Sequence, residues 1–276
     1  MTKKKITIGN IIVYIVLLVV VFFMIYPFLW MLITAFKNEA DIRSFPPVLF
    51  SGNYTLDNFK NIWNRIPFMA YYKNTLIFAG GVTACSILFD SMSGYAFARI
   101  HFRGCNILFT LVLVTLMIPF QVIMVPLYSE LFHMKLLNTY AGLILPRATN
   151  AFGIFMMRQF FVTLPVGLEE AARIDGCTEF QIYRRIMLPL CKPAIVTLII
   201  FHFMYNWNDL LYPLIIATRP NMKTLAAGLA SFMGTHVVEY GILMAGSVLS
   251  LLPIFIAYCL AQKSFVQGIA MTGMKG

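Results

Sequence analysis

The stretch IIVYIVLLVVVFFMIYPFLWMLITA, residues 11–35, decides the fold class of this chain. No charged residue lies between Lys5 and Lys37, and a helix of about 20 predominantly apolar residues is enough to cross a bilayer. This stretch therefore predicts a membrane-spanning helix.

Composition supports the same class. Hydrophobic residues make up 60% of the 276 residues, charged residues only 12%, and the mean hydropathy is +0.79. Soluble domains carry roughly 25% charged residues, so this chain has too few to cover its surface in water. The composition excludes a soluble globular enzyme, a disordered regulator and an ordinary nucleic-acid-binding domain.

Five further apolar runs follow, near residues 74–98, 107–128, 140–157, 193–218 and 241–261. With residues 11–35 they predict an all-α membrane protein with six transmembrane helices, forming one domain over residues 1–276. The fourth run is interrupted by Pro146, Arg147 and Asn150.

The basic N-terminus predicts the orientation. Lys3, Lys4 and Lys5 precede an apolar run far longer than the core of a signal peptide, so we expect an uncleaved first span with a cytoplasmic N-terminus. The short loops then obey the positive-inside rule. The net charge of +10 is explained by topology, and the sequence contains no nucleic-acid-binding motif.

The sequence contains no pattern typical of a catalytic or cofactor site. The five cysteines include no C-x-x-C pair and the four histidines are scattered, so we expect neither a disulfide framework nor a metal site. Serine-hydrolase, zinc-protease and Walker A motifs are also missing from the sequence. We expect a non-enzyme that binds no cofactor of its own.

A cytoplasmic loop is predicted at residues 158–192, between the fourth and fifth spans. Its most informative part is the segment 164–193, which reads LPVGLEEAARIDGCTEFQIYRRIMLPLCKP. Its chemistry predicts two short helices joined by a hinge. Pro165 suits the first position of one helix, Glu169 and Glu170 favour its N-terminal half, and Gly176 is placed to end it in the left-handed conformation.

The second helix of this loop is predicted to open with a capping box of Thr178 and Gln181. Its apolar stripe would consist of Phe180, Tyr183, Met187 and Leu190.

Two functions are open for this loop on chemistry alone. Ala171 and Ala172 beside Glu170 form a low face onto which another protein could pack, with its basic residues pairing to the carboxylates. The alternative is an amphipathic helix on the membrane surface.

The residues Glu170-Ala171-Ala172, Gly176, Ile186 and Leu188-Pro189 fit the pattern E-A-A-x3-G-x9-I-x-L-P. This pattern resembles the cytoplasmic-loop signature of permease subunits of binding-protein-dependent ABC importers.

Further segments extend the resemblance over nearly the whole chain. The sequence is similar to the second permease of carbohydrate importers of the maltose, glycerol-phosphate, raffinose and multiple-sugar type. The segments that carry this likeness are 95–99 (YAFAR), 117–121 (MIPFQ), 125–128 (VPLY), 174–176 (IDG), 206–209 (NWND), 213–215 (PLI) and 265–268 (FVQG).

The resemblance implies a multi-pass subunit of the bacterial plasma membrane that forms half of a pathway for a di- or oligosaccharide. It implies four kinds of partner: the lipid bilayer, a homologous second permease, two cytoplasmic ATPases that bind ATP and Mg, and an extracytoplasmic sugar-binding protein. The loop would dock in the ATPase as a coupling helix. Its expected coupling residues are Glu169, Glu170, Ala171, Ala172, Asp175, Gly176, Ile186, Leu188 and Pro189.

Polar groups inside the predicted spans invite a functional reading, because charges are costly at the bilayer centre. Each has an alternative without a role in transport: structural pairing with a polar residue of the partner permease for Asp90, solvation at the interface for Asp209, and subunit-interface pairing for Arg147. The candidate pathway-lining residues are Asp90, Gln121, Asn150, Asn206, Trp207, Asn208 and Asp209.

Two other classes of protein compete with this interpretation. A stand-alone secondary sugar transporter would be built from inverted repeats around an ion site at the midplane. A membrane-embedded enzyme would require a catalytic constellation.

Overall fold

The computed structural model describes residues 8–235 and 238–273. These residues form helices and loops, with one isolated antiparallel bridge between Lys37 and Tyr54. The chain divides into two compact units, Met1–Ile66 with Phe232–Leu252 and Pro67–Ser231 with Pro253–Gly276.

The first unit contains α1 (Ile8–Ala35), α2 (Glu39–Ile42) and α3 (Asp57–Arg65). The Asn58 amide donates hydrogen bonds to the carbonyls of Ala35 and Lys37 at the C-terminal end of α1. The apolar window of Gly9–Ala35 has none of its residues buried. An apolar surface of this length requires lipid or another apolar helix around it.

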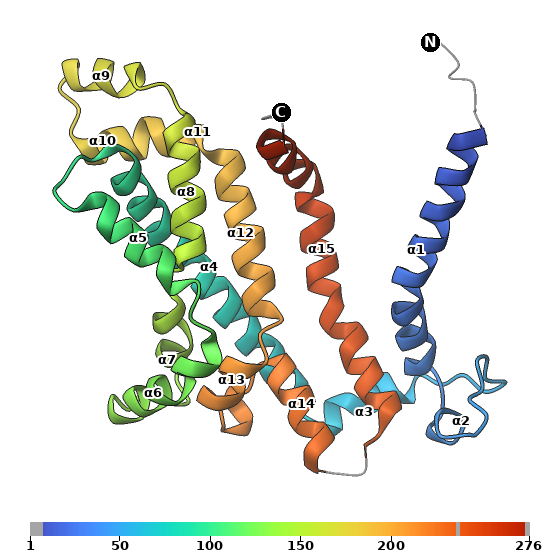
Figure 1. Cartoon of the computed structure of the whole chain (residues 1–276). Helices are drawn as coiled ribbons and strands as arrows, with labels where there is room; N and C mark the ends of the chain where they lie inside the picture. Colours follow the sequence, from blue (N-terminus) through green and yellow to red (C-terminus); the bar gives the residue numbers. More distant parts are fainter. Residues whose placement is uncertain (1–7, 236–237, 274–276) are drawn as a thin grey trace. The chain divides into compact units, whose positions relative to one another are not determined.

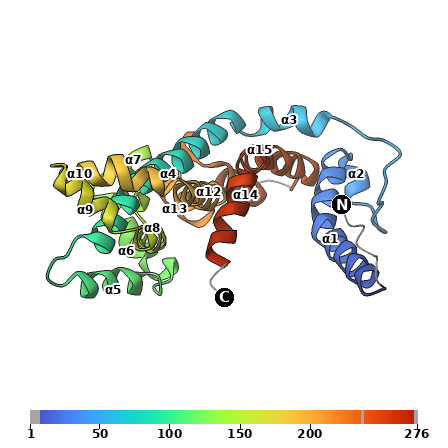
Figure 2. The same cartoon turned by 90° about the horizontal axis from the view of Figure 1, so that it is seen from above.

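The second unit is built on α4 (Phe68–Arg99), against which α8 (Ala151–Thr163) and α12 (Lys192–Trp207) pack (Figures 1 and 2). A Cβ on Gly94 would lie 2.7 Å from the Met157 Cβ, so a glycine permits this close crossing of α4 and α8. The core near this crossing consists of Tyr95, Met157, Phe161, Ala172, Ile182, Tyr183, Met187, Cys191, Ala194 and Leu198.

Three of the expected spans are not single straight helices. The run 107–128 is divided into α5 (Cys105–Thr115) and α6 (Phe120–His133), whose axes are bent by 97° relative to each other. Pro119 precedes α6 and interrupts the helix. The run 140–157 is divided into α7 (Tyr140–Ile144), the 3₁₀ turn η1 (Leu145–Arg147) and α8. The run 193–218 is divided into α12 and α13 (Leu211–Ile216).

Polar side chains lie at two of these breaks. Asn150 accepts a hydrogen bond from the Phe152 N–H and begins α8. Asp209 accepts one from the Tyr212 N–H across the break, although the N-cap residue of α13 is Leu210, and Asp209 lies beyond the end of α12 and not within a continuous helix.

By length and composition, two described helices can cross a membrane, Gly9–Ala35 and Phe68–Arg99. The number rises to five if three sharply bent pairs each count as one span: Cys105–Thr115 with Phe120–His133, Ala151–Thr163 with Gly167–Ile174, and Glu179–Leu190 with Lys192–Trp207. Tyr240–Ile256 is a shorter apolar helix. The remaining elements are α9 (Gly167–Ile174), α10 (Glu179–Ile182), the π-helix η2 (Tyr183–Met187), α11 (Leu188–Leu190), η3 (Pro220–Met222), α14 (Leu225–Thr235) and α15 (Tyr240–Gly273).

Candidate functional site

The loop between α8 and α12 is shaped by the local capping that its sequence predicts. Gly176 has φ +81° and ends α9 in the left-handed conformation, and the Cys177 N–H donates to the Ala172 carbonyl at 2.9 Å. The predicted hinge is therefore confirmed. The start of α9 differs, because its first helical residue is Gly167 and not Pro165.

The second half of the loop opens with the predicted capping box. The Gln181 N–H donates to the Thr178 hydroxyl, and the Thr178 N–H donates to the Gln181 side chain. The predicted apolar stripe is only half buried, because the chain continues as a π-helix whose period differs from that of an α-helix. Tyr183 and Met187 lie in the core, whereas Phe180 and Leu190 are exposed.

A buried ion pair attaches α9 to the end of α4. Arg99 Nε lies 3.3 Å from the Glu169 carboxylate, and these side chains are only 8% and 2% exposed. The Arg99 guanidinium also donates to the carbonyls of Phe161 and Leu164, where α8 ends. One side chain therefore connects three segments of the loop junction: α4, the end of α8, and α9.

A second set of contacts attaches α9 to α10. Arg173 Nε donates to the Glu179 carboxylate at 2.7 Å, and the Tyr95 hydroxyl donates to the same carboxylate at 3.2 Å. Arg173 also lies 3.7 Å from Glu169. The charges of Arg99, Glu169, Arg173 and Glu179 thus form one continuous network.

Burial and charge shift the pKa values of the two carboxyl groups in opposite directions. Burial raises the pKa of Glu169 above its ordinary value, although Arg99 and Arg173 act against that shift. The hydrogen bond from Arg173 lowers the pKa of Glu179.

The outer face of α9 is open. Glu170 and Ala171 are exposed, and Ile174 is 86% exposed. Ala172, by contrast, is 4% exposed and packs in the core of its own chain. The two alanines therefore lie on different faces of α9 and do not form one low surface as expected.

The other expected coupling residues lie at both ends of the loop. Asp175 is the exposed C-cap residue of α9, and Pro189 is exposed in α11. Ile186 and Leu188 pack partly buried against the core. The segment Glu179–Leu190, which runs from α10 to α11, makes an angle of 81° with α12.

Asp90 joins three helices inside the second unit. It is 0% exposed, and its Oδ1 accepts hydrogen bonds from the Thr149 hydroxyl (2.6 Å) and the Asn150 N–H (3.0 Å) at the start of α8. Its Oδ2 lies 3.1 Å from His202 Nε2 on α12. Gly153 leaves room for this contact, because a Cβ there would lie 2.0 Å from Oδ2. The geometry is that of a structural junction.

Arg147 and Asp209 form an ion pair with an N–O distance of 2.7 Å. The guanidinium also lies over three aromatic rings, at 5.3 Å from Phe120, 5.5 Å from Tyr205 and 4.5 Å from Tyr212. Both charges are paired within the chain.

A cavity of about 300 Å³ adjoins this ion pair. Of the expected pathway residues, it brings together Asn150 and Asn206. Asp90 and Asp209 do not line it, Gln121 and Asn208 are exposed elsewhere, and Trp207 is buried beside the ring of Tyr72. The lining residues are Thr115, Leu116, Ile118, Phe120, Ile123, Leu127, Pro146, Arg147, Thr149, Asn150, His202, Tyr205 and Asn206.

Sequence reasoning missed the intramolecular partners of these groups. Arg99 and His202 were not assigned to Glu169 and Asp90, because these contacts join distant parts of the chain. Arg173 and Glu179, six positions apart across the predicted hinge, carried a local signal that would have identified their ion pair. Within residues 8–235 and 238–273, no group of three or more His, Cys, Asp or Glu side chains is arranged to hold a metal ion.

Comparisons with known proteins give this geometry its context. The chain is 36% identical over 260 residues to the arabinooligosaccharides transport system permease protein AraQ of Halalkalibacterium halodurans, with 93% of each chain covered. It is 36% identical over 276 residues to the probable ABC transporter permease protein YurM of Bacillus subtilis, covering 99% of this chain and 91% of that one. It is 34% identical over 253 residues to the sn-glycerol-3-phosphate transport system permease protein UgpE of Salmonella typhi, covering 89% and 90%.

The fold is shared with a solved transporter. The chain is similar, with a TM-score of 0.84, to a chain in the crystal structure of a bacterial ABC transporter involved in the import of the acidic polysaccharide alginate. The similarity covers 96% of this chain and 99% of that one at 22% identity. Residues 91–270 match the family described as the binding-protein-dependent transport system inner membrane component. The chain therefore belongs to this family, as a permease subunit of an ABC importer and not as an enzyme.

Proposed function

We propose that this chain is one of two permease subunits of an ATP-driven importer for a di- or oligosaccharide. The names of its relatives support the carbohydrate class. Its partners would be a homologous permease, two ATPase subunits that bind ATP and Mg, and an extracytoplasmic binding protein that delivers the sugar.

The observation that carries this proposal is the contrast between two adjacent glutamates on α9. Glu169 is buried in the chain's own ion-pair network, whereas Glu170 is exposed beside Ala171 and Ile174. An exposed carboxylate flanked by small and apolar side chains suits a protein groove that carries a basic residue. We assign this groove to the ATPase.

The membrane topology proposed for this function has six spans and a cytoplasmic N-terminus in a bacterial plasma membrane. The spans are α1, α4, the bent segment α5–α6, the segment α7–α8, the segment α12–α13 and α15. The loop 158–192, which includes the C-terminal end of α8, then lies in the cytoplasm, where Arg158, Arg173, Arg184, Arg185 and Lys192 agree with the positive-inside rule.

Coupling follows from how α9 is attached. When ATP-driven closure of the ATPases displaces α9, the ion pair of Glu169 with Arg99 transmits that displacement to α4, and Leu188-Pro189 transmits it to α12. A rigid attachment of this kind moves whole helices, which is what a switch from inward-facing to outward-facing requires.

Sugar passage is assigned to the cavity beside Arg147. Asn150 and Asn206 offer amide groups to sugar hydroxyls there, and the exposed ring of Tyr205 offers a stacking face. Asp90, enclosed by its own chain, is assigned a structural role.

Transport driven by ATP is tested in proteoliposomes that contain the complete complex. Uptake of labelled sugar should require the loaded binding protein and enclosed ATP, and Glu170→Lys should abolish it without loss of complex in the membrane. Glu170→Gln serves as the size-matched control and should retain part of the activity. Sugar uptake by the chain alone, driven by an ion gradient without ATP, would establish the rival secondary transporter.

A further inference from the structure

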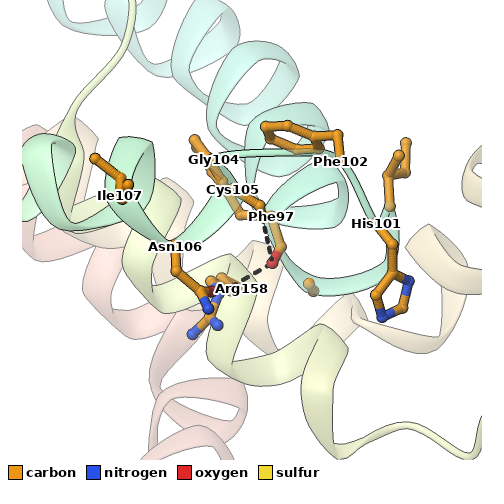
Figure 3. A pocket seen from close by; sticks show the side chains of 10 residues that line it. Phe97, His101, Phe102, Gly104, Cys105, Asn106, Ile107 and Arg158 are labelled. Carbon is orange, nitrogen blue, oxygen red and sulfur yellow. Dashed lines mark hydrogen bonds between the residues drawn. The ribbon is translucent and has the colours of Figure 1, made fainter.

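A cavity of about 490 Å³ lies where α4 ends and α5 begins (Figure 3). It is separate from the coupling network and from the cavity beside Arg147. Its lining residues are Phe97, Ala98, Ile100, His101, Phe102, Gly104, Cys105, Asn106, Ile107 and Arg158.

Arg158 of α8 supplies the positive charge of this cavity. Its Nε donates to the Phe97 carbonyl at 3.2 Å, and its guanidinium lies 4.2 Å from the centre of the buried Phe109 ring (Figure 3 shows the bond to Phe97). Among the described residues, no hydrogen bond or carboxylate engages the two terminal nitrogens of Arg158. The guanidinium is thus held in place with two donor groups free.

The surroundings of Arg158 favour an anion. None of the ten lining residues is acidic, whereas Asn106 adds an amide and His101 an imidazole. The first turn of α5, which begins at Cys105, contains no acidic residue, so the positive end of its helix dipole adds to the same field.

The rim of the cavity is apolar. Phe102 is 40% exposed and Ile107 is 69% exposed, and the apolar face of α5 continues from there with the exposed Leu108 and Leu111. A free anion gains nothing from such a rim, whereas a lipid with an anionic headgroup matches both parts. Basic pockets between membrane helices on the cytoplasmic side bind phospholipid headgroups in this way.

We propose that this cavity binds the headgroup of an anionic phospholipid, with the phosphate on Arg158 and the acyl chains against Phe102 and Ile107. Arginine suits this task because its terminal nitrogens can pair with two phosphate oxygens. The site would hold lipid at the junction of α4, α5 and α8, beside the loop that precedes α9.

The test uses the complete complex in detergent, titrated with short-chain phosphatidylglycerol or phosphatidylcholine. Arg158→Gln should weaken phosphatidylglycerol binding about tenfold, the size of a lost charged hydrogen bond. Arg103→Gln removes one positive charge from the exposed turn between α4 and α5, where Arg103 does not line the cavity, and it should change binding less than about twofold. Equal weakening by both variants would show diffuse attraction and overturn the proposal.

A measurement on the unaltered protein does not depend on how Arg158→Gln folds. Cys105 lines the cavity, so phosphatidylglycerol should slow its reaction with a water-soluble maleimide severalfold, while Cys177, outside the cavity, reacts unchanged. Equal protection by phosphatidylcholine would remove the role assigned to charge. Equal protection by inorganic phosphate would show that the site takes a free anion and not a lipid.

Discussion

Arg99, the last residue of α4, and Glu169, in the first turn of α9, form a buried ion pair with a separation of 3.3 Å. This pair fixes the loop that carries the exposed Glu170 to a long helix of the second unit. The two adjacent carboxylates therefore differ in role: Glu169 holds the loop in place, and Glu170 faces outward.

Replacing Glu169 by glutamine should destabilise the protein. The change leaves the buried Arg99 charge without its carboxylate, and breaking a buried pair destabilises by about 3–5 kcal/mol. We expect the lower end of that range, because the carbonyls of Phe161 and Leu164 still accept from Arg99. Thermal unfolding of the detergent-solubilised complex checks this. Glu170→Gln is the matched control and should stay within about 0.5 kcal/mol, so equal destabilisation would contradict the division of roles.

Gly176 should tolerate alanine only in part and proline not at all. Its φ of +81° costs an alanine about 1 kcal/mol, whereas proline cannot adopt this angle at all. Proline also removes the N–H that donates to the backbone carbonyl of Arg173. We expect Gly176→Ala to retain partial transport and Gly176→Pro to abolish sugar-stimulated ATP hydrolysis. Full ATPase stimulation in the proline variant would show that the hinge is not required.

The crossing of α4 and α8 should depend on Gly94. A Cβ at Gly94 would lie 2.7 Å from the Met157 Cβ and 2.9 Å from the Arg158 backbone nitrogen, neither of which can yield cheaply. Gly94→Ala should destabilise by about 1–3 kcal/mol through overpacking. Gly80, also in α4, has no atom within 4 Å of its Cβ position, so Gly80→Ala should be neutral or stabilising by up to about 1 kcal/mol. Thermal melts of the two variants make the comparison, and equal effects would contradict it.

The contact between Arg173 and Glu179 should make the loop sensitive to acid. Because the folded-state pKa of Glu179 is lowered, the pair stabilises above the unfolded pKa of about 4.3, and this contribution disappears as the pH falls through the lowered value. The effect should stay below about 1 kcal/mol, since Glu179 is 47% exposed.

Arg173→Gln tests this pH dependence. It should weaken the loss of stability that we expect below about pH 4.3, the unfolded pKa of a glutamate. Melting curves with the same acid limb in the variant and the parent would refute the assignment to Glu179.

Local features of the loop could be predicted from the sequence. The left-handed Gly176 and the capping box of Thr178 and Gln181 depend on residues at most a few positions apart, and the structure confirms both. The membrane class followed from composition alone. The family followed from a spaced signature in which Gly176 has a backbone role.

Long-range relationships could not be predicted in the same way. Nothing near Asp90 indicates that Thr149, Asn150 and His202 enclose it, because helix packing sets this contact. The apolar runs gave the positions of helical material but not its breaks, since hydropathy does not distinguish a bent span from a straight one. The division of α5 from α6 at Pro119 was therefore missed.

The exposed face of α9 is tested most directly by site-specific crosslinking. A cysteine that carries a benzophenone is placed at Ala171, or at Ala172 as a buried control, in the complete complex. We expect a crosslink to the ATPase subunit from position 171, which is exposed, and little or none from position 172, which is 4% exposed. A crosslink from position 171 to lipid alone, with the ATPase present and active, would contradict the account.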